Sequence, residues 1–355
     1  MEIHQFATSL TYGDAISDEI MEIQKVLREK GYASEIFTKF YDPRMAMFAR
    51  DFREYKKFSS PQNVVIFHFS IGSPVSKMFS RIPDKKIMIY HNITPHKFFV
   101  DYHRILSREC YKGRLEIRLF VDKVDLSLGD SEFNREELEE VGFPKTGVMP
   151  LLMNFSKFNE DGDPITRDVF SNGKTTILFV GRIIPNKKFE DVVKIFYFYK
   201  KYFNPDSQLL LVGDYRGMER YLDVLQNLVG RLKLTDVHFT GHIGFSELVS
   251  FYRLAHIYLS MSEHEGFGVP LLESFYMRVP VVAYAAGAVE ETMNGGGVVL
   301  FKKGFLKAAA LLDMIHRDSK IKEKIVASQL EALRKYKKER ASQILLNHIE
   351  RVVAA

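Results

Sequence analysis

The sequence predicts an α/β protein made of two doubly wound domains that face each other across a cleft. Short apolar runs alternate with amphipathic helical patterns, as in parallel sheets that are covered by helices on both faces. The alternation stops once, in the polar and turn-rich stretch 151–172, and then starts again. A chain of 355 residues is also long enough for about two domains that each bury a core.

The first half begins with a strand at 2–7 and an amphipathic helix at 17–32, which we expect Ser17 to cap and Gly31 to end. Five further apolar runs predict strands at 34–38, 63–70, 86–92, 125–131 and 146–151. These elements predict an N-terminal domain at 1–150.

The second half repeats the alternation more regularly. Its apolar runs predict strands at 174–182, 208–214, 237–242, 256–260 and 279–285. Its periodic segments predict helices at 188–202, 218–232, 246–255 and 270–278, followed by helical pattern to the end. We therefore expect a linker at 151–172, a C-terminal domain at 173–325, and a helix at 326–355 that could pack back on the N-terminal domain.

Composition narrows the class of protein. Hydrophobic residues make up 46% of the chain and charged residues 27%, which is typical of a soluble globular protein. Cys110 is the single cysteine, so the chain has no internal disulfide and suits a reducing cytoplasm. No signal peptide is evident, and no apolar run approaches the roughly 18 residues that span a bilayer. We expect a cytoplasmic protein, which could also lie at the inner face of the membrane. The net charge of +5 does not imply that it binds nucleic acid.

One segment concentrates positive charge. Residues 77–118 contain ten basic and four acidic residues, with aromatic side chains between them. Such a surface suits anionic lipid or a phosphorylated acceptor, which would make the protein a peripheral membrane protein. An ordinary solvated helix explains the same pattern.

Open α/β sheets bind ligands beyond the carboxyl ends of their strands. The stretch "SEHEGFGVPLLESF" (262–275) follows a predicted strand and opens a helix, whose free N–H groups favour phosphate. Gly266 and Gly268 permit close backbone approach, Glu265 could accept hydrogen bonds from ligand hydroxyls, and Glu273 could hold a vicinal diol. A tight turn with exposed glutamates is the alternative.

A second motif, "VGRIIPNKK", follows the first strand of the second half. Arg182 offers a rigid fork for phosphate oxygens and Lys187 a mobile charge, so together they could stabilise a departing diphosphate without a metal ion. Basic residues in a surface loop are the alternative. The Asp161-Gly162-Asp163 sequence lies in the predicted linker, where we interpret it as a turn, and no His or Cys cluster shows zinc-ligand spacing.

These motifs together resemble the retaining GT-B glycosyltransferases of family four, also called glycosyl transferases group 1. The resemblance covers most of residues 175–300, through "VGRIIPNKK", "FTGHIGFSELVSFYRLAHIYLSMSEHEGFGVPLLESFYMRVPVVAYAAGAVEET" and "NGGGVVL". The first half fits less closely, through "YGDAISDEIMEIQKVLREKGYASEIFT", "YHNITP" and "GDSEFNREELEEVGFPKTGVMPLLMN". The family usually has two glycines near its first strand, whereas this chain has Gly13 alone.

The resemblance implies a GT-B fold of two Rossmann-like domains and a role for each matching residue. The implied catalytic residues are Glu265 at the donor sugar, Arg182 and Lys187 at the diphosphate, and His91 at the donor sugar. The implied donor-binding residues are Gly13, Gly181, Gly241, Gly266, Phe267, Gly268, Val269 and Glu273, the last on the ribose.

The expected function is therefore the retaining, metal-independent transfer of a hexose from a UDP- or GDP-sugar to a hydroxyl of a glycan or lipid-linked acceptor. The expected process is polysaccharide biosynthesis, with the nucleotide sugar as donor substrate and no further cofactor. The alternatives are a sugar phosphorylase or sucrose-type synthase on the same fold, and a sugar-nucleotide-binding protein without catalysis.

Overall fold

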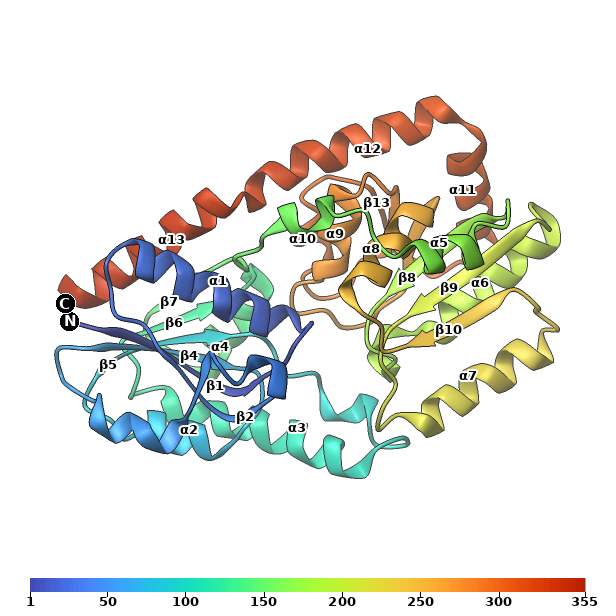
Figure 1. The fold of residues 1–355 in the computed structure, drawn as a ribbon. Helices are drawn as coiled ribbons and strands as arrows, with labels where there is room; N and C mark the ends of the chain where they lie inside the picture. Colours follow the sequence, from blue (N-terminus) through green and yellow to red (C-terminus); the bar gives the residue numbers. More distant parts are fainter. Residues whose placement is uncertain (355) are drawn as a thin grey trace. The chain divides into compact units, whose positions relative to one another are not determined.

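The computed structural model describes residues 1–354, which form two compact units. The first unit contains Met1–Lys97, Ile105–Asn154 and the chain from Lys335 onward. The second unit contains Phe98–Arg104 and Phe155–Arg334. Each unit has one parallel sheet flanked by helices, so the predicted doubly wound α/β class is confirmed (Figure 1).

The sheet of the first unit has seven strands in the order β3-β2-β1-β4-β5-β6-β7. They are β1 (Ile3–Leu10), β2 (Ile36–Tyr41), β3 (Ala49–Asp51), β4 (Val64–Phe69), β5 (Lys85–Tyr90), β6 (Leu126–Gly129) and β7 (Thr146–Val148). The order reverses between β1 and β4, and the carboxyl ends of the strands at such a switch point form the ligand side of this kind of sheet.

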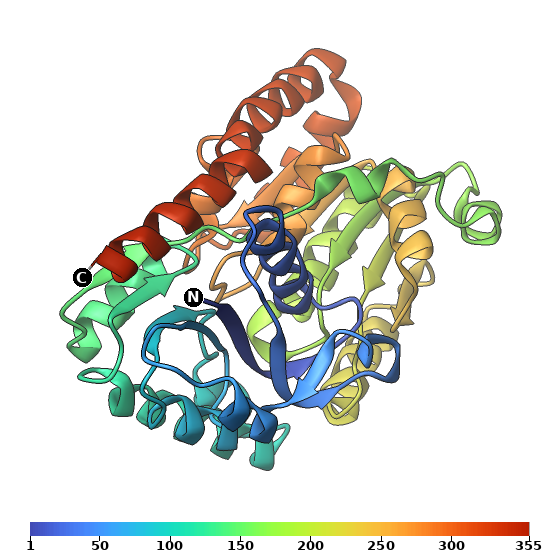
Figure 2. The same ribbon diagram turned by 60° about the vertical axis from the view of Figure 1, so that its left-hand side comes forward.

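Helices cover both faces of this sheet. On one face, α1 (Ala15–Glu29) and α13 (Lys338–Ala354) share a core with the strands, in which Ile23, Leu27, Leu345 and Ile349 are buried. The other helices are α2 (Pro74–Phe79), α3 (Arg104–Glu116) and α4 (Glu132–Val141). Figures 1 and 2 show α2 and α3 below the sheet and α1 and α13 above it.

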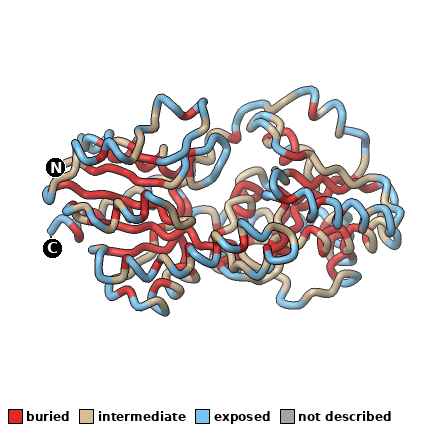
Figure 3. The backbone as a smooth tube through the Cα atoms, turned by 90° about the horizontal axis from the view of Figure 1, so that it is seen from below, coloured by how far each residue is buried: buried red, intermediate tan, exposed pale blue. Residues whose placement is uncertain are grey.

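The sheet of the second unit has six parallel strands in the order β10-β9-β8-β11-β12-β13. They are β8 (Thr175–Val180), β9 (Ser207–Val212), β10 (Val237–Gly241), β11 (Ile257–Ser260), β12 (Val281–Tyr284) and β13 (Val298–Leu300). The order reverses between β8 and β11, and these central strands are fully buried. Figure 3 shows buried stretches of backbone in red within both units.

The helices of the second unit pack against its strands and against one another. They are α5 (Pro164–Phe170), α6 (Phe189–Tyr202), α7 (Glu219–Arg231), α8 (Phe245–Leu254), α9 (Val269–Tyr276), α10 (Val289–Met293), α11 (Phe305–Arg317) and α12 (Ser319–Leu333). Helix α6 packs against α7 and α11, whereas α8 packs against β8 and α5, and α9 against β12, α10 and α12. No helix within residues 1–354 has the length and hydropathy needed to cross a membrane.

Three local predictions need correction. Asp14, not Ser17, caps α1, because its carboxylate accepts hydrogen bonds from the backbone N–H and the hydroxyl of Ser17. The short edge strand β3 was missed, since its sequence, Ala-Arg-Asp, carries no apolar pattern. The stretch 151–172 includes helix α5, whose N-cap is Asp163.

Candidate active site

The predicted donor-site residues follow the two central strands of the second sheet. Gly181 and Arg182 follow β8 directly, and Glu265 lies in the loop that joins β11 to α9. Strands β8 and β11 pair with each other at the switch point, so these loops start from neighbouring strand ends. The sheet topology therefore brings together segments that are about 80 residues apart in sequence.

Lys187 and Glu265 form a bidentate ion pair at this edge. The Lys187 ammonium lies 2.6 Å from each carboxylate oxygen of Glu265. The two side chains are only 17% and 10% exposed, so water screens their attraction weakly. Removing either partner would leave a largely buried charge without compensation, which is costly.

Glycine fixes the backbone of Glu265. The Ala288 N–H donates to the Glu265 carbonyl at 3.0 Å, and Gly287 has a left-handed φ of 57°. A Cβ at Gly287 would lie 2.3 Å from that carbonyl oxygen. The turn after β12 thus fits against Glu265 only with glycine, and this packing role of Gly287 was not predicted.

Asn186 joins the Lys187 turn to the Glu265 loop. Its side-chain N–H donates to the backbone carbonyl of His264 at 3.1 Å. Its backbone carbonyl accepts from the N–H of Glu263 at 2.8 Å. Its side-chain oxygen is buried without a partner among the described residues. Asn186 was not predicted to position the site, although it lies directly before Lys187.

Two glycines, Gly181 and Gly213, bring the loops after β8 and β9 together. A Cβ at Gly213 would lie 2.0 Å from the Gly181 carbonyl oxygen. The Ile183 N–H then donates to the Asp214 carbonyl at 2.9 Å. Arg182 extends from this loop with an exposed side chain and donates to the Arg216 carbonyl at 3.4 Å. Arg182 and Lys187 therefore share a loop but differ in environment, since only Lys187 is held by a carboxylate.

The glycine-rich loop forms the start of α9. Gly268 is the N-cap with a left-handed φ of 97°, and Val269 is the first helical residue after Gly266 and Phe267. The Phe267 side chain is buried, and its carbonyl accepts from the Thr292 hydroxyl at 2.6 Å. Phe267 therefore anchors the loop by packing.

Glu273 lies one turn into α9 and is buried. It accepts a hydrogen bond of 2.6 Å from the hydroxyl of Tyr252 on α8. Burial, followed by the charge of Glu273, raises the pKa of Tyr252 well above 10, so the hydroxyl stays a donor.

Gly241, at the end of β10, has a left-handed φ of 72°. A Cβ at this position would lie 3.2 Å from the ring of Tyr215.

The remaining predicted residues belong to the first unit. Gly13 follows β1 with a left-handed φ of 78°, directly before the α1 cap Asp14. Apart from its two neighbours in the chain, no other residue within 1–354 has an atom within 4 Å of the position that a Cβ would take. His91 follows β5 and is buried, with Nε2 at 3.0 Å from His68 Nδ1 and Nδ1 at 3.4 Å from Asp130 Oδ2. A ligand could contact a His91 ring nitrogen only if that nitrogen left its present partner.

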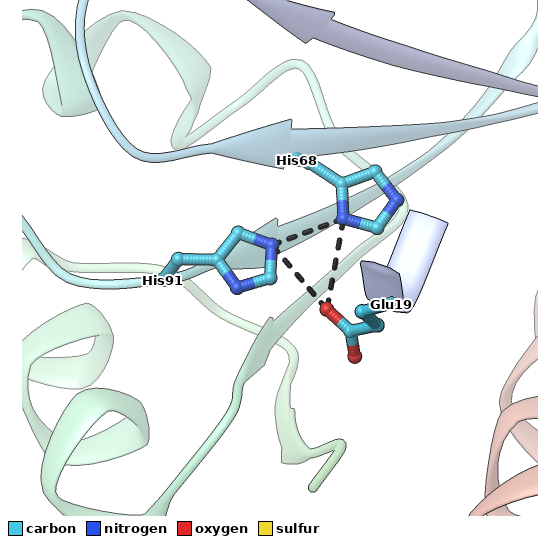
Figure 4. A group of neighbouring side chains, drawn as sticks. All are labelled: Glu19, His68 and His91. Atoms are coloured by element: carbon cyan, nitrogen blue, oxygen red, sulfur yellow. Dashed lines mark hydrogen bonds and ion pairs between the residues drawn. The ribbon is translucent and has the colours of Figure 1, made fainter. Parts of the chain in front are cut away.

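The structure also assembles a group that sequence reasoning missed. Glu19 on α1, His68 on β4 and His91 after β5 lie with one oxygen or nitrogen each within 4.8 Å of the others, and all three are buried (Figure 4). Burial raises the pKa of Glu19 to about 7, against the lowering effect of His91. The three residues come from distant segments, so no sequence spacing could have revealed them.

Comparison with known proteins identifies the family. The family model described as glycosyl transferases group 1 matches residues 165–344, about half of the chain. The chain belongs to this family, as the resemblance of its motifs predicted.

Relatives and solved structures agree with this assignment. The O-antigen chain mannosyltransferase B of Escherichia coli is 22% identical over 77% of this chain and 68% of its own. A probable sucrose-phosphate synthase of Thermosipho melanesiensis is 24% identical over 84% of this chain and 72% of its own. The structure of HepE from Anabaena with UDP-glucose has a TM-score of 0.73 at 16% identity and covers 99% of this chain and 100% of its own. The fold is therefore GT-B, and the chain is a glycosyltransferase.

Proposed function

We propose that this glycosyltransferase moves a hexose from a UDP- or GDP-sugar to a hydroxyl of a glycan or lipid-linked acceptor, with retention of anomeric configuration. The observation that carries the proposal is the Lys187–Glu265 ion pair, which lies at the switch point of the second sheet. A lysine held at this edge supplies positive charge where a diphosphate would leave, and the paired carboxylate can accept hydrogen bonds from sugar hydroxyls.

The donor site is expected to work by electrostatic stabilisation. The leaving diphosphate would draw on Lys187, on the exposed Arg182, and on the N–H groups at the start of α9. Glu273 would accept from the ribose hydroxyls, with Tyr252 holding its carboxylate in place. Because these groups supply the charge, the reaction is proposed to need no divalent metal and no further cofactor.

The acceptor class rests on the relatives. One relative is named for O-antigen chains, and a Staphylococcus aureus relative, 26% identical over 49% of this chain and 45% of its own, is named for capsular polysaccharide biosynthesis. Polysaccharide biosynthesis in the cytoplasm, at the inner face of the membrane, is the process that we propose.

A sucrose-type synthase is the second candidate. The sucrose-phosphate synthase relative favours it, since that match covers more of this chain than the mannosyltransferase match does. The two functions differ in acceptor, because the synthase would use a free phosphorylated sugar.

A donor and acceptor screen tests the proposal. The protein is incubated with UDP- and GDP-hexoses, alone, with a lipid-linked glycan or with fructose 6-phosphate, and release of the nucleoside diphosphate is followed. We expect slow release from at least one donor alone and faster release with the glycan, and NMR of the product should show the donor's anomeric configuration. Nucleotide binding without any release would instead support a non-catalytic binding protein, and stimulation by fructose 6-phosphate alone would support the synthase.

A further inference from the structure

We propose that Glu19, His68 and His91 bind one divalent transition-metal ion inside the first unit. The three side chains project toward a common point from α1, from β4 and from the end of β5 (Figure 4). Two imidazoles and one carboxylate form a ligand set that suits zinc and its neighbours rather than magnesium or calcium.

The hydrogen bonds around the cluster determine which nitrogens carry hydrogen. Gln5 donates its side-chain N–H to the Ile20 carbonyl at 3.0 Å, so its oxygen is the atom that faces His68 Nε2 at 3.0 Å. His68 Nε2 must therefore donate. On the other ring, His91 Nδ1 faces the Asp130 carboxylate and donates as well.

Both remaining ring nitrogens consequently present lone pairs when the histidines are neutral. His68 Nδ1 and His91 Nε2 lie 3.0 Å apart, and the two rings are inclined by only 7°. Glu19 Oε2 adds a third acceptor, which is buried and has no hydrogen-bond partner among the described residues. Three acceptors thus converge without a donor.

A single extra proton satisfies this arrangement only in part, because it leaves Glu19 with an ion pair and no hydrogen bond. A proton shared by the two imidazoles would satisfy His68 and His91, but Glu19 Oε2 would remain 3.7 Å from His91 Nε2 and 3.9 Å from His68 Nδ1. Both distances are too long for a hydrogen bond. A metal cation satisfies all three atoms at once and also balances the buried carboxylate charge.

The distances fit a metal ion of the size of zinc. Separations of 3.0, 3.7 and 3.9 Å leave room between the three atoms for an ion at a distance of at least about 2.1 Å from each, and about 2.1 Å is the usual length of a zinc–imidazole bond. The other ring nitrogen of each histidine already has an oxygen partner, which is Gln5 for His68 and Asp130 for His91. Metal-binding histidines are characteristically oriented in this way.

Such an ion would tie α1 to the carboxyl ends of β4 and β5. It would occupy Nε2 of His91, whose Nδ1 faces Asp130, so His91 would hold the ion rather than contact the donor sugar. Its site lies within the first unit, and its test uses metal binding rather than glycosyl transfer, so its failure would leave the proposed function untouched.

Zinc binding by the full chain tests the proposal. Metal-free protein, prepared with a chelator and confirmed by elemental analysis, is titrated with Zn²⁺ against a competing chromophoric chelator. We expect about one Zn²⁺ per chain with an apparent Kd below about 1 µM near neutral pH. Co²⁺ in place of Zn²⁺ should give the visible d–d spectrum of a four- or five-coordinate site.

Variants identify the ligands. His68→Gln and Glu19→Gln should each weaken zinc binding by at least about 10-fold, and Asp130→Asn by about 10- to 100-fold. His348→Gln is the matched control, because His348 is also a buried histidine of the first unit but bonds to the Val148 carbonyl. It should bind zinc like the wild type.

Several outcomes would overturn the proposal. They are a wild-type chain that takes up no stoichiometric zinc, a Co²⁺ spectrum of the hexaaqua ion, and equal losses in His348→Gln and His68→Gln. Circular dichroism checks that each variant is folded, and the wild-type titration and Co²⁺ spectrum decide the question even if a variant does not fold. The cluster would then be a protonated histidine pair.

Discussion

Lys187 and Glu265 hold each other in place through a largely buried ion pair. Their 2.6 Å contacts hold the ammonium in one place and so prepare it for a diphosphate. Asn186 and Gly287 keep the two backbone segments in register, through a hydrogen bond to His264 and through close approach to the Glu265 carbonyl. Pairing thus removes part of the reorganisation that a mobile surface lysine would need.

Arg182 differs from Lys187 in its freedom, and this leads to a first prediction. Its exposed side chain has a weak hydrogen bond to Arg216, so it can turn toward a bound diphosphate. Arg182→Ala should lower kcat/KM for nucleotide release by about 2–4 kcal/mol of transition-state stabilisation. Arg231→Ala, at the exposed end of α7, is the control and should behave like the wild type. If folded Arg182→Ala stays within about threefold of wild type, the assignment is wrong.

Sequence reasoning identified the charged residues of the site but not their contacts. The position of Glu265 after a strand and before a glycine-rich helix start predicted a ligand-facing carboxylate. Its pairing with Lys187, 78 residues earlier, depends on the adjacency of β8 and β11, which no local pattern encodes. The Glu19–His68–His91 group was missed for the same reason.

Among the elements, helix α5 accounts for the Asp161-Gly162-Asp163 motif, which forms the turn and the cap before the helix. Gly162 takes a left-handed φ of 78°, and the Asp163 carboxylate accepts from the Thr166 N–H at 2.6 Å as the N-cap of α5. Hydrogen bonds from the side chain and then from the backbone of Thr166 lower the pKa of Asp163, whose carboxylate caps α5.

A second prediction follows for metal use in transfer. Initial rates of nucleotide release, measured without added Mg²⁺ or Mn²⁺ and directly after adding excess EDTA, should match the rates measured with either ion. The exposure to EDTA is kept short so that an ion buried in the first unit stays bound. Activity that disappears with EDTA and returns with Mg²⁺ or Mn²⁺ would show that Arg182 and Lys187 do not suffice, and Asp161→Ala would then be the next variant.

Helix α3 lies within the basic segment 77–118 and carries several of its basic residues. Four of the segment's ten basic residues bond to other groups of the protein. Lys85 and Lys86 bond to backbone carbonyls, and Lys112 and Arg114 pair with Glu109 and Glu137. Others stay exposed beside exposed apolar side chains of the same segment. The exposed set is Arg104, Arg108 and Arg118 with Ile105, Leu115 and Leu119.

This exposed set predicts binding to anionic membranes. The wild type should bind phosphatidylglycerol vesicles, and binding should weaken as salt rises, because the Debye length falls from about 10 Å at 0.1 M to about 3 Å at 1 M. Arg104, Arg108 and Arg118 changed together to Gln should bind much less, since each basic residue near the surface contributes about 1 kcal/mol. A triple change of Lys320, Lys324 and Lys335 to Gln, in the second unit and at the start of the last segment, is the charge-matched control. Equal binding by both triple variants, or none by the wild type, would favour an acceptor in solution.

At the scale of the whole chain, the fold class was predictable and several boundaries were not. Alternating buried strands and amphipathic helices predicted both parallel sheets, because that pattern follows from burial on two faces. Residues Phe98–Arg104 belong to the second unit because of their contacts, which the sequence pattern does not reveal. Tyr102 packs edge-on against Tyr221, with the ring centroids 5.0 Å apart. The final segment joins the first unit for the same kind of reason, through Leu345 and Ile349 in its core.

The central claim is that the end of β8 and the end of β11 together form the site at which the donor is cleaved. Lys187 and Lys174 allow a matched comparison, because they lie beyond opposite ends of β8. Lys187 pairs with the carboxylate of Glu265, and Lys174 pairs with that of Asp236. The decisive measurement is kcat/KM for nucleoside diphosphate release by folded Lys187→Met and Lys174→Met. We predict a loss of about 100-fold or more for Lys187→Met and a value within about threefold of wild type for Lys174→Met. Near-wild-type release by Lys187→Met, or an equal loss in both variants, would contradict the account.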